Sequence, residues 1–309
     1  MRIAIMGTGG VGGYFGGRLA AAGHNVWFIA RGEHLRTIRE SGLTVASTKG
    51  DFVIFPAQAT DDPHSVGAAE LVVVAVKTWQ LPQAAEQTIP LVGEDTIVLP
   101  LLNGVEAVGE LSKVLPAGNI LGGLCKIISY VEAPGRIRHQ AAEPTVVFGE
   151  TDNQMSDRVE SMRALFEGAG VNAEIAPDLA VAVWTKFMLI STWSGIGAVT
   201  RAPVGVWRSL PGTRAMAETS LEETRRVGRA LGVALSPELI AESMAYIDRI
   251  SPDGTASMQR DITEGRPSEL ESQSGAVVRL GSEAGVPTPT HEFFYSILLP
   301  QETAARRGL

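Results

Sequence analysis

Apolar positions follow one pattern in the first 175 residues and another after them. Short apolar runs occur at residues 2–6, 26–30, 71–76, 96–102 and 170–175, with helical spacing between them. Runs of this length predict β-strands, and the run 71–76, which does not alternate with polar residues, indicates a central strand buried on both faces. A hairpin is predicted over residues 43–47 and 52–59.

Helical periodicity dominates the rest of the chain. Asp178 is a suitable N-cap, and apolar residues recur at helical spacing over residues 179–193, 212–231, 237–246 and 268–284. Strands that alternate with helices, followed by helices alone, predict an α/β fold with an N-terminal Rossmann-type doubly wound sheet and a C-terminal all-helical domain. We place the boundary after residue 177, giving domains of residues 1–177 and 178–309.

Composition narrows the classes of function. The 309 residues carry a formal net charge of −8, so no broad basic surface is expected for nucleic acid or an anionic membrane. The single cysteine, Cys125, forms no disulfide within the chain, which fits a reducing compartment such as the cytoplasm. The N-terminus does not resemble a signal peptide, and no uninterrupted run of about 18 apolar residues predicts a transmembrane helix. The five histidines are scattered, so no metal is expected.

A glycine motif follows the first apolar run and opens a helical segment. Its residues are Gly7, Thr8, Gly9, Gly10, Val11 and Gly12. In a strand–helix–strand unit of about 30 residues, such a motif indicates a dinucleotide site. The first glycine permits the tight turn, the second lets the backbone approach the pyrophosphate, and the third permits close packing of helix on strand. The alternative is a glycine-rich turn without a ligand.

Arg31 ends the second predicted strand, where an acidic residue would bind the ribose 2′-hydroxyl of NAD. An arginine there favours the 2′-phosphate of NADPH, because a guanidinium binds phosphate through two hydrogen bonds and stays charged. Glu33, two residues on, leaves open that the loop turns so that this carboxylate takes the hydroxyl role. Arg31 could also be an ordinary surface residue.

Lys77 and Asn103 each follow a buried apolar run. Ligands of open α/β sheets bind beyond the carboxyl ends of the strands, so both side chains are candidates for contact with the cofactor. The alternatives are a solvent-exposed lysine and an asparagine that only forms the turn with Gly104.

Lys186 is the only charged residue between positions 179 and 200, and one of only five lysines in the chain. Desolvation disfavours a charged ammonium, so a lysine in apolar surroundings is suited to donate a proton near neutral pH. The alternative is a lysine that extends to the surface from an apolar helix. Glu269 lies after Ser268, which with Glu271 predicts a capping box, and a carboxylate in a first helical turn needs no further role.

Taken together, these residues resemble the ketopantoate reductase (2-dehydropantoate 2-reductase) family over nearly the whole chain, up to residues 286–289. The resemblance rests on the order and spacing of residues 7–12, Arg31, Val76-Lys77, Asn103-Gly104, Trp184-Thr185-Lys186, Ser257-Met258 with Asp261, and Glu269.

The resemblance implies an active site in a cleft between the two domains and NADPH-dependent reduction of ketopantoate to pantoate in pantothenate biosynthesis. It also implies a homodimer formed through the helical domain. By match, Arg31 holds the 2′-phosphate, and Lys77 and Asn103 lie at the cofactor and substrate. Lys186 is the general acid, Ser257 binds substrate, and Glu269 supports the site.

Three positions depart from the family. Asparagines usually stand four and eight residues after the lysine, where this chain has Ile190 and Ser194, and three residues before the serine, where it has Gly254. The altered pocket leaves open a reductase or dehydrogenase of the same architecture that acts on a more apolar 2-oxo acid. A non-catalytic NADP(H)-binding redox sensor is a third possibility, which Lys186 and Glu269 argue against because a sensor needs no proton donor.

Overall fold

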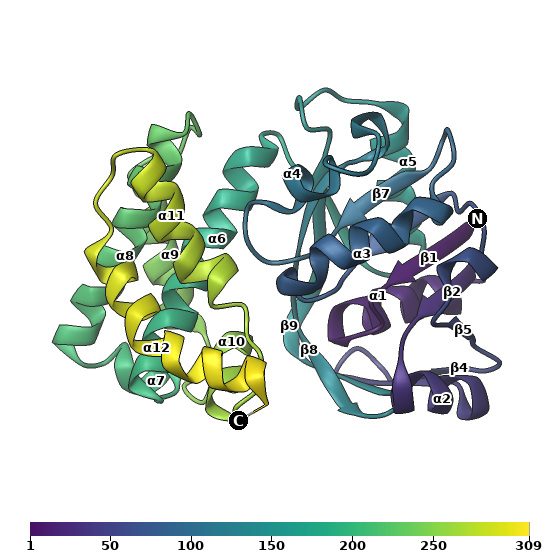
Figure 1. Cartoon of the computed structure of the whole chain (residues 1–309), viewed down its shortest axis with the longest axis horizontal. Helices are drawn as coiled ribbons and strands as arrows, with labels where there is room; N and C mark the ends of the chain where they lie inside the picture. The colour runs from purple at the N-terminus through teal and green to yellow at the C-terminus, as the bar shows by residue number, and fades with distance from the viewer. Residues whose placement is uncertain (309) are drawn as a thin grey trace. The chain divides into compact units, whose positions relative to one another are not determined.

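The computed structural model describes residues 1–308, apart from the side chains of residues 141 and 142, and divides into two compact units. The sheet unit comprises Met1–Leu102 and Glu106–Leu179. The helical unit comprises Asn103–Val105 and the chain from Ala180 onward. The three residues Asn103–Val105 thus belong to the helical unit, although the chain before and after them belongs to the sheet unit. The main boundary between the two units falls after Leu179. The strands of Figure 1 all belong to the sheet unit.

The first sheet is parallel throughout, in the order β5-β2-β1-β6-β7. These strands span Gln58–Thr60, Asn25–Ile29, Arg2–Met6, Leu71–Val74 and Ile97–Pro100. Counted along the chain, the order is 3-2-1-4-5, so the strand order reverses between β1 and β6. The predicted doubly wound Rossmann-type sheet is thus confirmed, and sheets of this kind bind ligands where the strand order reverses, here beyond the carboxyl ends of β1 and β6.

A second sheet, which the apolar pattern did not predict, has the order β10-β9-β3-β4, with β8 paired to β9. Its strands span Asn172–Ile175, Arg136–Gly149, Leu43–Ser47, Phe52–Ile54 and Gly122–Ala133. The prediction of one strand over residues 52–59 was wrong. Residues 52–54 pair with β3 in this sheet, whereas residues 58–60 pair with β2 in the first sheet. Pro56 lies between them and has no N–H to continue a ladder.

Helix α1, Gly10–Ala21, contacts strands of both sheets, and its buried side chains join one core with them. A Cβ at Gly16 would lie 2.6 Å from Cγ1 of Ile5, so the helix approaches β1 too closely for any side chain there. The other helices of the sheet unit are α2 Gly32–Ser41, α3 Leu81–Thr88, α4 Ala107–Leu111 and α5 Asp157–Gly168.

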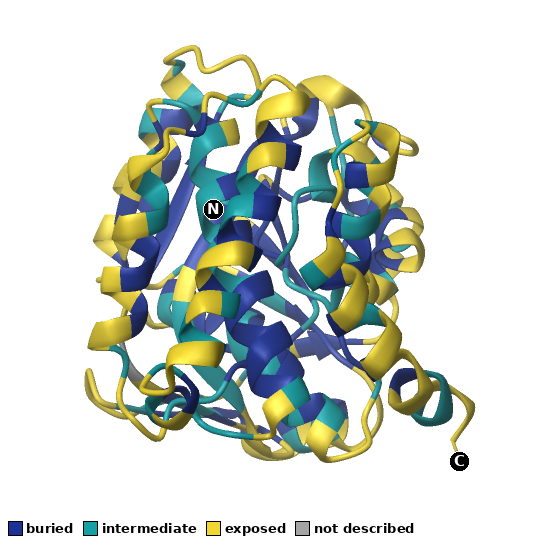
Figure 2. Ribbon diagram, turned by 90° about the vertical axis from the view of Figure 1, so that its left-hand side faces the viewer, coloured by how far each residue is buried: buried dark blue, intermediate teal, exposed yellow. Residues whose placement is uncertain are grey.

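The helical unit contains α6 Leu179–Thr200, α7 Val204–Trp207, α8 Pro211–Ala230, α9 Glu238–Arg249, α10 Ser257–Thr263, the π-helical turn η5 Glu271–Gly275, α11 Ala276–Glu283 and α12 Pro289–Arg307. Most are amphipathic, and Figure 2 shows them striped with buried and exposed residues. Their apolar faces pack around Trp207, Phe294 and other large side chains that are fully buried.

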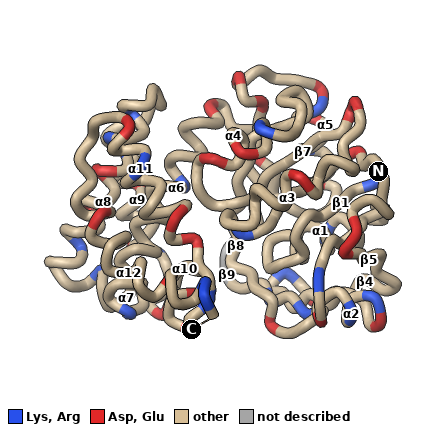
Figure 3. The backbone as a smooth tube through the Cα atoms, viewed as in Figure 1, with Lys and Arg blue, Asp and Glu red and all other residues tan. Residues whose placement is uncertain are grey.

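Helix α6 differs from these amphipathic helices because it is apolar on nearly all sides. Figure 3 shows it almost free of charge, whereas basic and acidic residues are interspersed over both units. Among the described residues, it is the one helix long and apolar enough to cross a membrane, with a mean hydropathy of 1.3 over its best 18 residues. Since 56% of that window is buried, the composition also fits a core helix.

Candidate functional site

The glycine motif forms a tight loop between β1 and α1. Gly7 has φ +99°, and a Cβ there would lie 2.7 Å from Cγ1 of Val76. A Cβ at Gly12 would collide with the carbonyl oxygen of Gly7. At Gly9, by contrast, a Cβ would meet no protein atom within 4 Å. The first and third glycines are therefore required by the protein itself, and the second faces open space.

Gly9 is also the N-cap of α1 and supplies no side-chain cap to the first turn. The first amides of an α-helix have no intrahelical partner, and together with the helix dipole they favour an anion. An open approach at Gly9 and an uncapped helix N-terminus are what the pyrophosphate of a dinucleotide requires. The residues present therefore fit the pyrophosphate of a dinucleotide.

Two side chains hold the glycine loop in place. The Thr8 hydroxyl donates to the carbonyl oxygen of Ile29 at the end of β2 (3.0 Å). The Gly135 amide donates to Nδ1 of His34 (3.0 Å), so Nε2 carries the hydrogen and donates to the Thr8 carbonyl oxygen (2.8 Å). Burial lowers the pKa of His34, which keeps the ring neutral. Sequence reasoning missed His34, because its second partner lies 101 residues away.

Arg31 is the N-cap residue of α2, and its exposed side chain donates to Oε1 of Gln87 on α3 (2.8 Å). Glu33 pairs with Arg36 at 2.5 Å, one turn along the same helix. The carboxylate that sequence analysis considered for the ribose hydroxyl is therefore already engaged by a cation. Arg31, bonded only to a neutral amide among the described residues, is the side chain with charge to offer a phosphate.

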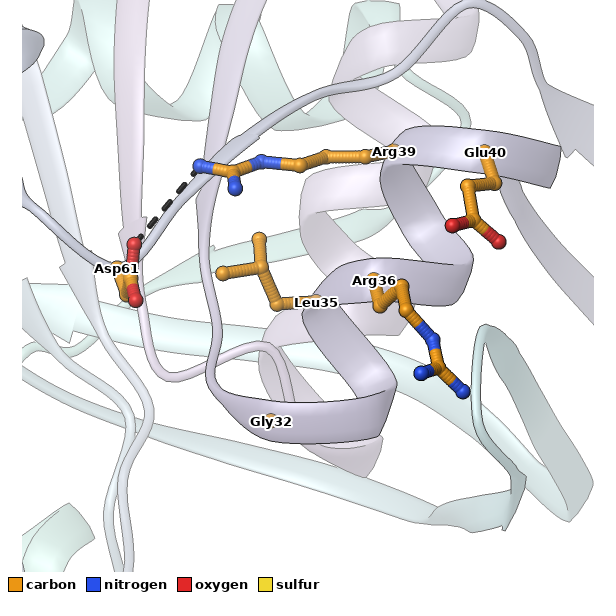
Figure 4. A pocket seen from close by; sticks show the side chains of 6 residues that line it. All are labelled: Gly32, Leu35, Arg36, Arg39, Glu40 and Asp61. Atoms are coloured by element: carbon orange, nitrogen blue, oxygen red, sulfur yellow. Dashed lines mark ion pairs between the residues drawn. The ribbon is translucent and has the colours of Figure 1, made fainter.

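A depression of about 510 Å³ lies beside α2 and is shown in Figure 4. It is lined by Gly32, Leu35, Arg36, Arg39, Glu40 and Asp61. Arg39 donates to the Ala59 carbonyl oxygen (2.9 Å) and lies 3.8 Å from the Asp61 carboxylate. Two arginines and two acidic residues line the same depression, so it presents no net positive charge of its own.

Lys77 is half-buried after β6 and precedes the short 3₁₀ turn Thr78–Gln80. Its amide donates to Oε1 of Gln80 (3.3 Å). β6 neighbours β1, and both strands run parallel, so Lys77 and the glycine loop lie at the same edge of the first sheet. This is the edge at which the strand order reverses.

Asn103 and Glu269 form a polar pair within the helical unit, although 166 positions separate them. Nδ2 of Asn103 donates to Oε2 of Glu269 (2.8 Å), and the glutamate is only 4% exposed. Gly104 packs beside this pair, since a Cβ there would lie 3.1 Å from the Ser272 carbonyl oxygen. Two residues selected separately from the sequence are therefore brought together.

The capping box predicted for Ser268 and Glu271 was wrong. The Ser268 hydroxyl donates to Oε2 of Glu302 (2.5 Å), and the Glu271 carboxylate accepts from the Tyr295 hydroxyl (2.7 Å). Both partners lie on α12, where no local pattern points to them. The helix that follows begins with the π-helical turn η5, in which the Gly275 amide donates to the Leu270 carbonyl oxygen (2.9 Å). Such turns occur frequently at functional sites.

Helix α6 carries Lys186, Ile190 and Ser194 one turn apart, on one side of the helix. Lys186 and Ile190 are half-buried, and Ser194 is fully buried. Among the described residues, no hydrogen bond or ion pair engages the Lys186 ammonium. The charge is therefore held in an apolar helix without a fixed protein partner.

Ser257 is the first residue of α10 and is half-buried. Asp261, one turn on, is 7% exposed and accepts from the Arg266 guanidinium (2.9 Å). Gly254, in the preceding turn, donates its amide to the Ser251 carbonyl oxygen (2.8 Å). Among the described residues, no cluster of three or more His, Cys, Asp or Glu side chains could hold a metal ion.

Comparisons with known proteins assign both units to one family. The family model "Ketopantoate reductase PanE/ApbA" matches residues 3–153, and its C-terminal counterpart matches residues 178–302. A 2-dehydropantoate 2-reductase from Mesorhizobium japonicum is 30% identical, over 100% of this chain and 99% of that protein. The PanE/ApbA family ketopantoate reductase from Ralstonia eutropha JMP134 is also 30% identical, with a TM-score of 0.91 over 99% of this chain and 100% of that one. A D-mandelate dehydrogenase crystallised with NADH shares the fold, with a TM-score of 0.91 at 23% identity over 99% of both chains.

Proposed function

Because the chain belongs to the ketopantoate reductase family, whose members are nicotinamide-dependent oxidoreductases acting on CH–OH groups, we propose that it reduces ketopantoate to pantoate with NADPH. The observation that carries this proposal is the hydrogen bond from the half-buried Asn103 to the buried Glu269, in a unit whose apolar helix also holds the unengaged Lys186. On the same basis, we propose a role in pantothenate biosynthesis in the cytoplasm, and a homodimer formed through the helical unit.

The bound dinucleotide supplies the hydride that C2 of the substrate receives. Lys186 donates a proton to the oxygen on C2, so that a 2-oxo group, a hydride and a proton together give the 2-hydroxyl. General acid catalysis of this kind contributes about 10²–10⁴-fold. Asn103, held by Glu269, orients substrate and cofactor, and Ser257 adds a hydroxyl for the substrate.

The proposed preference for NADPH rests on Arg31. Its guanidinium is exposed and bonded to a neutral amide, whereas the competing Glu33 is paired with Arg36. A phosphate is bound more strongly by such a cation than a hydroxyl is, because the hydrogen bonds are charge-assisted. The rest of the cofactor contacts in the proposal are made by the glycine loop and Lys77.

A second candidate function follows from Ile190. It stands one turn after Lys186, where the family usually has an amide, and an isoleucine cannot bind a polar substrate group. This favours a more apolar 2-oxo acid. Steady-state kinetics of wild type and Ile190→Asn distinguish the two candidates: a gain for ketopantoate in the variant supports the apolar pocket. A wild type that prefers ketopantoate, with no gain in the variant, excludes it.

The test of the proposed function is NADPH oxidation with a panel of 2-oxo acids that includes ketopantoate, 3-methyl-2-oxobutanoate and phenylglyoxylate. Phenylglyoxylate belongs in the panel because a D-mandelate dehydrogenase shares the fold. We expect ketopantoate to give the highest kcat/KM. Binding of NADPH without turnover of any panel member would instead indicate a redox sensor.

A further inference from the structure

Several polar side chains of the helical unit are buried without a partner, and three of them carry a hydroxyl or an amide. Among the residues that the structure describes, no hydrogen bond is made by Oγ of Ser194, by Oγ of Ser274, or by either polar atom of the Gln273 amide. Leaving such a group unpaired costs about 1–3 kcal/mol, so buried polar groups nearly always have partners. Gln273 is the most extreme case, because both its donor and its acceptor are unsatisfied.

Other buried polar side chains in the same unit do have hydrogen-bond partners. Gln259, 4% exposed, accepts from the Ala256 amide (3.4 Å) and donates to the Ala202 carbonyl oxygen (3.0 Å). On α6, Ser191 and Thr200 donate to the carbonyl oxygen four residues back, and Ser194 does not. The fold can therefore pair buried hydroxyls and amides, and Gln273 differs from the other unpartnered side chains, Trp193 and Trp207 among them, because both its donor and its acceptor are left unpaired.

Gln273 lies in η5, close to the Asn103–Glu269 pair. The backbone N–H of Gln273 donates to the backbone carbonyl oxygen of Glu269 (3.0 Å), which places Gln273 one turn after the glutamate on the same side of the helix. The preceding residue, Ser272, offers the carbonyl oxygen against which Gly104 packs. Because a π-helical turn carries an extra residue, Ser274 also lies on the side of the turn that carries Glu269.

The unpartnered groups of α6 and η5 are also close in the fold. A Cβ at Gly195, next to Ser194, would collide with the ring of Phe294, and a Cβ at Gly275, next to Ser274, would lie 2.9 Å from the ring of Tyr295. Phe294 and Tyr295 are consecutive on α12, so both segments pack against the same part of that helix.

We propose that Gln273 determines substrate specificity by hydrogen bonding a hydroxyl group on the side chain of the 2-oxo acid. A hydroxyl both donates and accepts, so it satisfies the amide oxygen and the amide nitrogen at once. A carboxylate would leave the amide oxygen unpaired and would be repelled by the nearby Glu269. The proposal rests on the proposed function and refines it: Gln273 supplies the amide that positions 190, 194 and 254 lack.

The test uses two substrates that differ by one oxygen atom, ketopantoate and 3,3-dimethyl-2-oxobutanoate, in which a methyl group replaces the hydroxymethyl group. We expect the wild type to favour ketopantoate in kcat/KM by roughly ten- to a hundredfold. Gln273→Met keeps the size of the side chain and removes the amide. It should remove this preference by raising the KM for ketopantoate, with kcat/KM for the analogue within about threefold of wild type.

Gln259→Met is the matched control, because it removes a buried amide that has partners. It should lower the thermal stability and leave the substrate preference unchanged, whereas Gln273→Met should leave stability equal or higher, since it removes an unpaired amide. Equal losses on both substrates in Gln273→Met, or an unchanged preference, would overturn the specificity role alone. A wild type that reduces neither compound would overturn the proposed function together with this inference.

Discussion

Two regions are built in different ways: the edge of the first sheet that carries residues 7–12 and Lys77, here called the cofactor edge, and the polar interior of the helical unit around Asn103, Glu269 and Gln273. At the cofactor edge, backbone shape dominates: Gly7 and Gly12 leave no room for side chains, and Thr8 and His34 hold the loop with complete hydrogen bonds. In the helical unit, side chains dominate, and some have partners far along the chain while Gln273 has none among the described residues. The glycine loop is thus shaped mainly by close backbone packing, whereas the polar interior of the helical unit depends on side chains brought together from distant parts of the chain.

The substitution with the largest expected effect is at Lys186, in the helical unit. Lys186→Ala should lower kcat by about 10²–10⁴-fold, because the proton donor is lost, while the dissociation constant of NADPH stays within a few-fold. Lys113→Ala, which removes an exposed lysine paired with Glu110, is the control and should change neither quantity. Turnover by Lys186→Ala within a few-fold of wild type would mean that another group is the acid.

The next test concerns His291, a buried histidine of the helical unit, and the stability of the protein at low pH. His291 is fully buried, bonded through Nε2 to Ser220 and Thr224, and burial lowers its pKa to about 4. Since the unfolded chain takes up this proton near pH 6.5, the stability present above pH 6.5 is lost progressively as the pH falls toward 4. The loss reaches about 3 kcal/mol at pH 4.

Urea unfolding of wild type and His291→Gln between pH 7 and pH 4 measures this contribution. The variant cannot titrate at this position, so the difference between the two pH profiles isolates the histidine from the carboxylates. Parallel profiles would show that His291 does not account for the acid sensitivity.

Substitution of Arg31 tests whether a positive charge at the cofactor edge binds the 2′-phosphate of NADPH. Arg31→Ala should weaken NADPH binding by roughly ten- to a hundredfold and leave NADH binding nearly unchanged, since only NADPH carries the 2′-phosphate. Arg163→Ala, which removes an exposed arginine paired with Glu160 on α5, is the control and should affect the binding of both cofactors little. Equal affinities for the two cofactors in the wild type, unchanged by Arg31→Ala, would refute the assignment.

Substitution of Gly9 tests whether the open backbone at the cofactor edge admits the pyrophosphate, and it has the smallest expected effect. Gly9→Ala should weaken dinucleotide binding by roughly tenfold, about 1.4 kcal/mol, because the methyl group obstructs the approach of the pyrophosphate. Thermal stability should not change, since no protein atom lies within 4 Å of the added carbon. Gly118→Ala, also in open space, is the control. Unchanged binding in Gly9→Ala would place the pyrophosphate elsewhere.

The sequence predicted the features that depend on local pattern. The glycine loop, the strand ends before Lys77 and Asn103, and the apolar helix around Lys186 follow from residue spacing within a few turns. The hairpin of β8 and β9 was missed, and residues 52–59 were assigned to one strand, because sheet membership depends on distant partners. The partners of Ser268 and Glu269 and the π-helical turn are tertiary features too, set by α12 and the Asn103 turn.

The central claim is that this protein transfers a hydride from a nicotinamide dinucleotide to C2 of a 2-oxo acid. Incubation with NADPH deuterated at the transferable C4 position and ketopantoate, followed by NMR of the product, tests it directly. We predict deuterium at C2 of pantoate, with one pantoate formed for each NADPH oxidised. Cofactor that binds but remains reduced, or pantoate without deuterium at C2 when either C4 position is labelled, would contradict the claim.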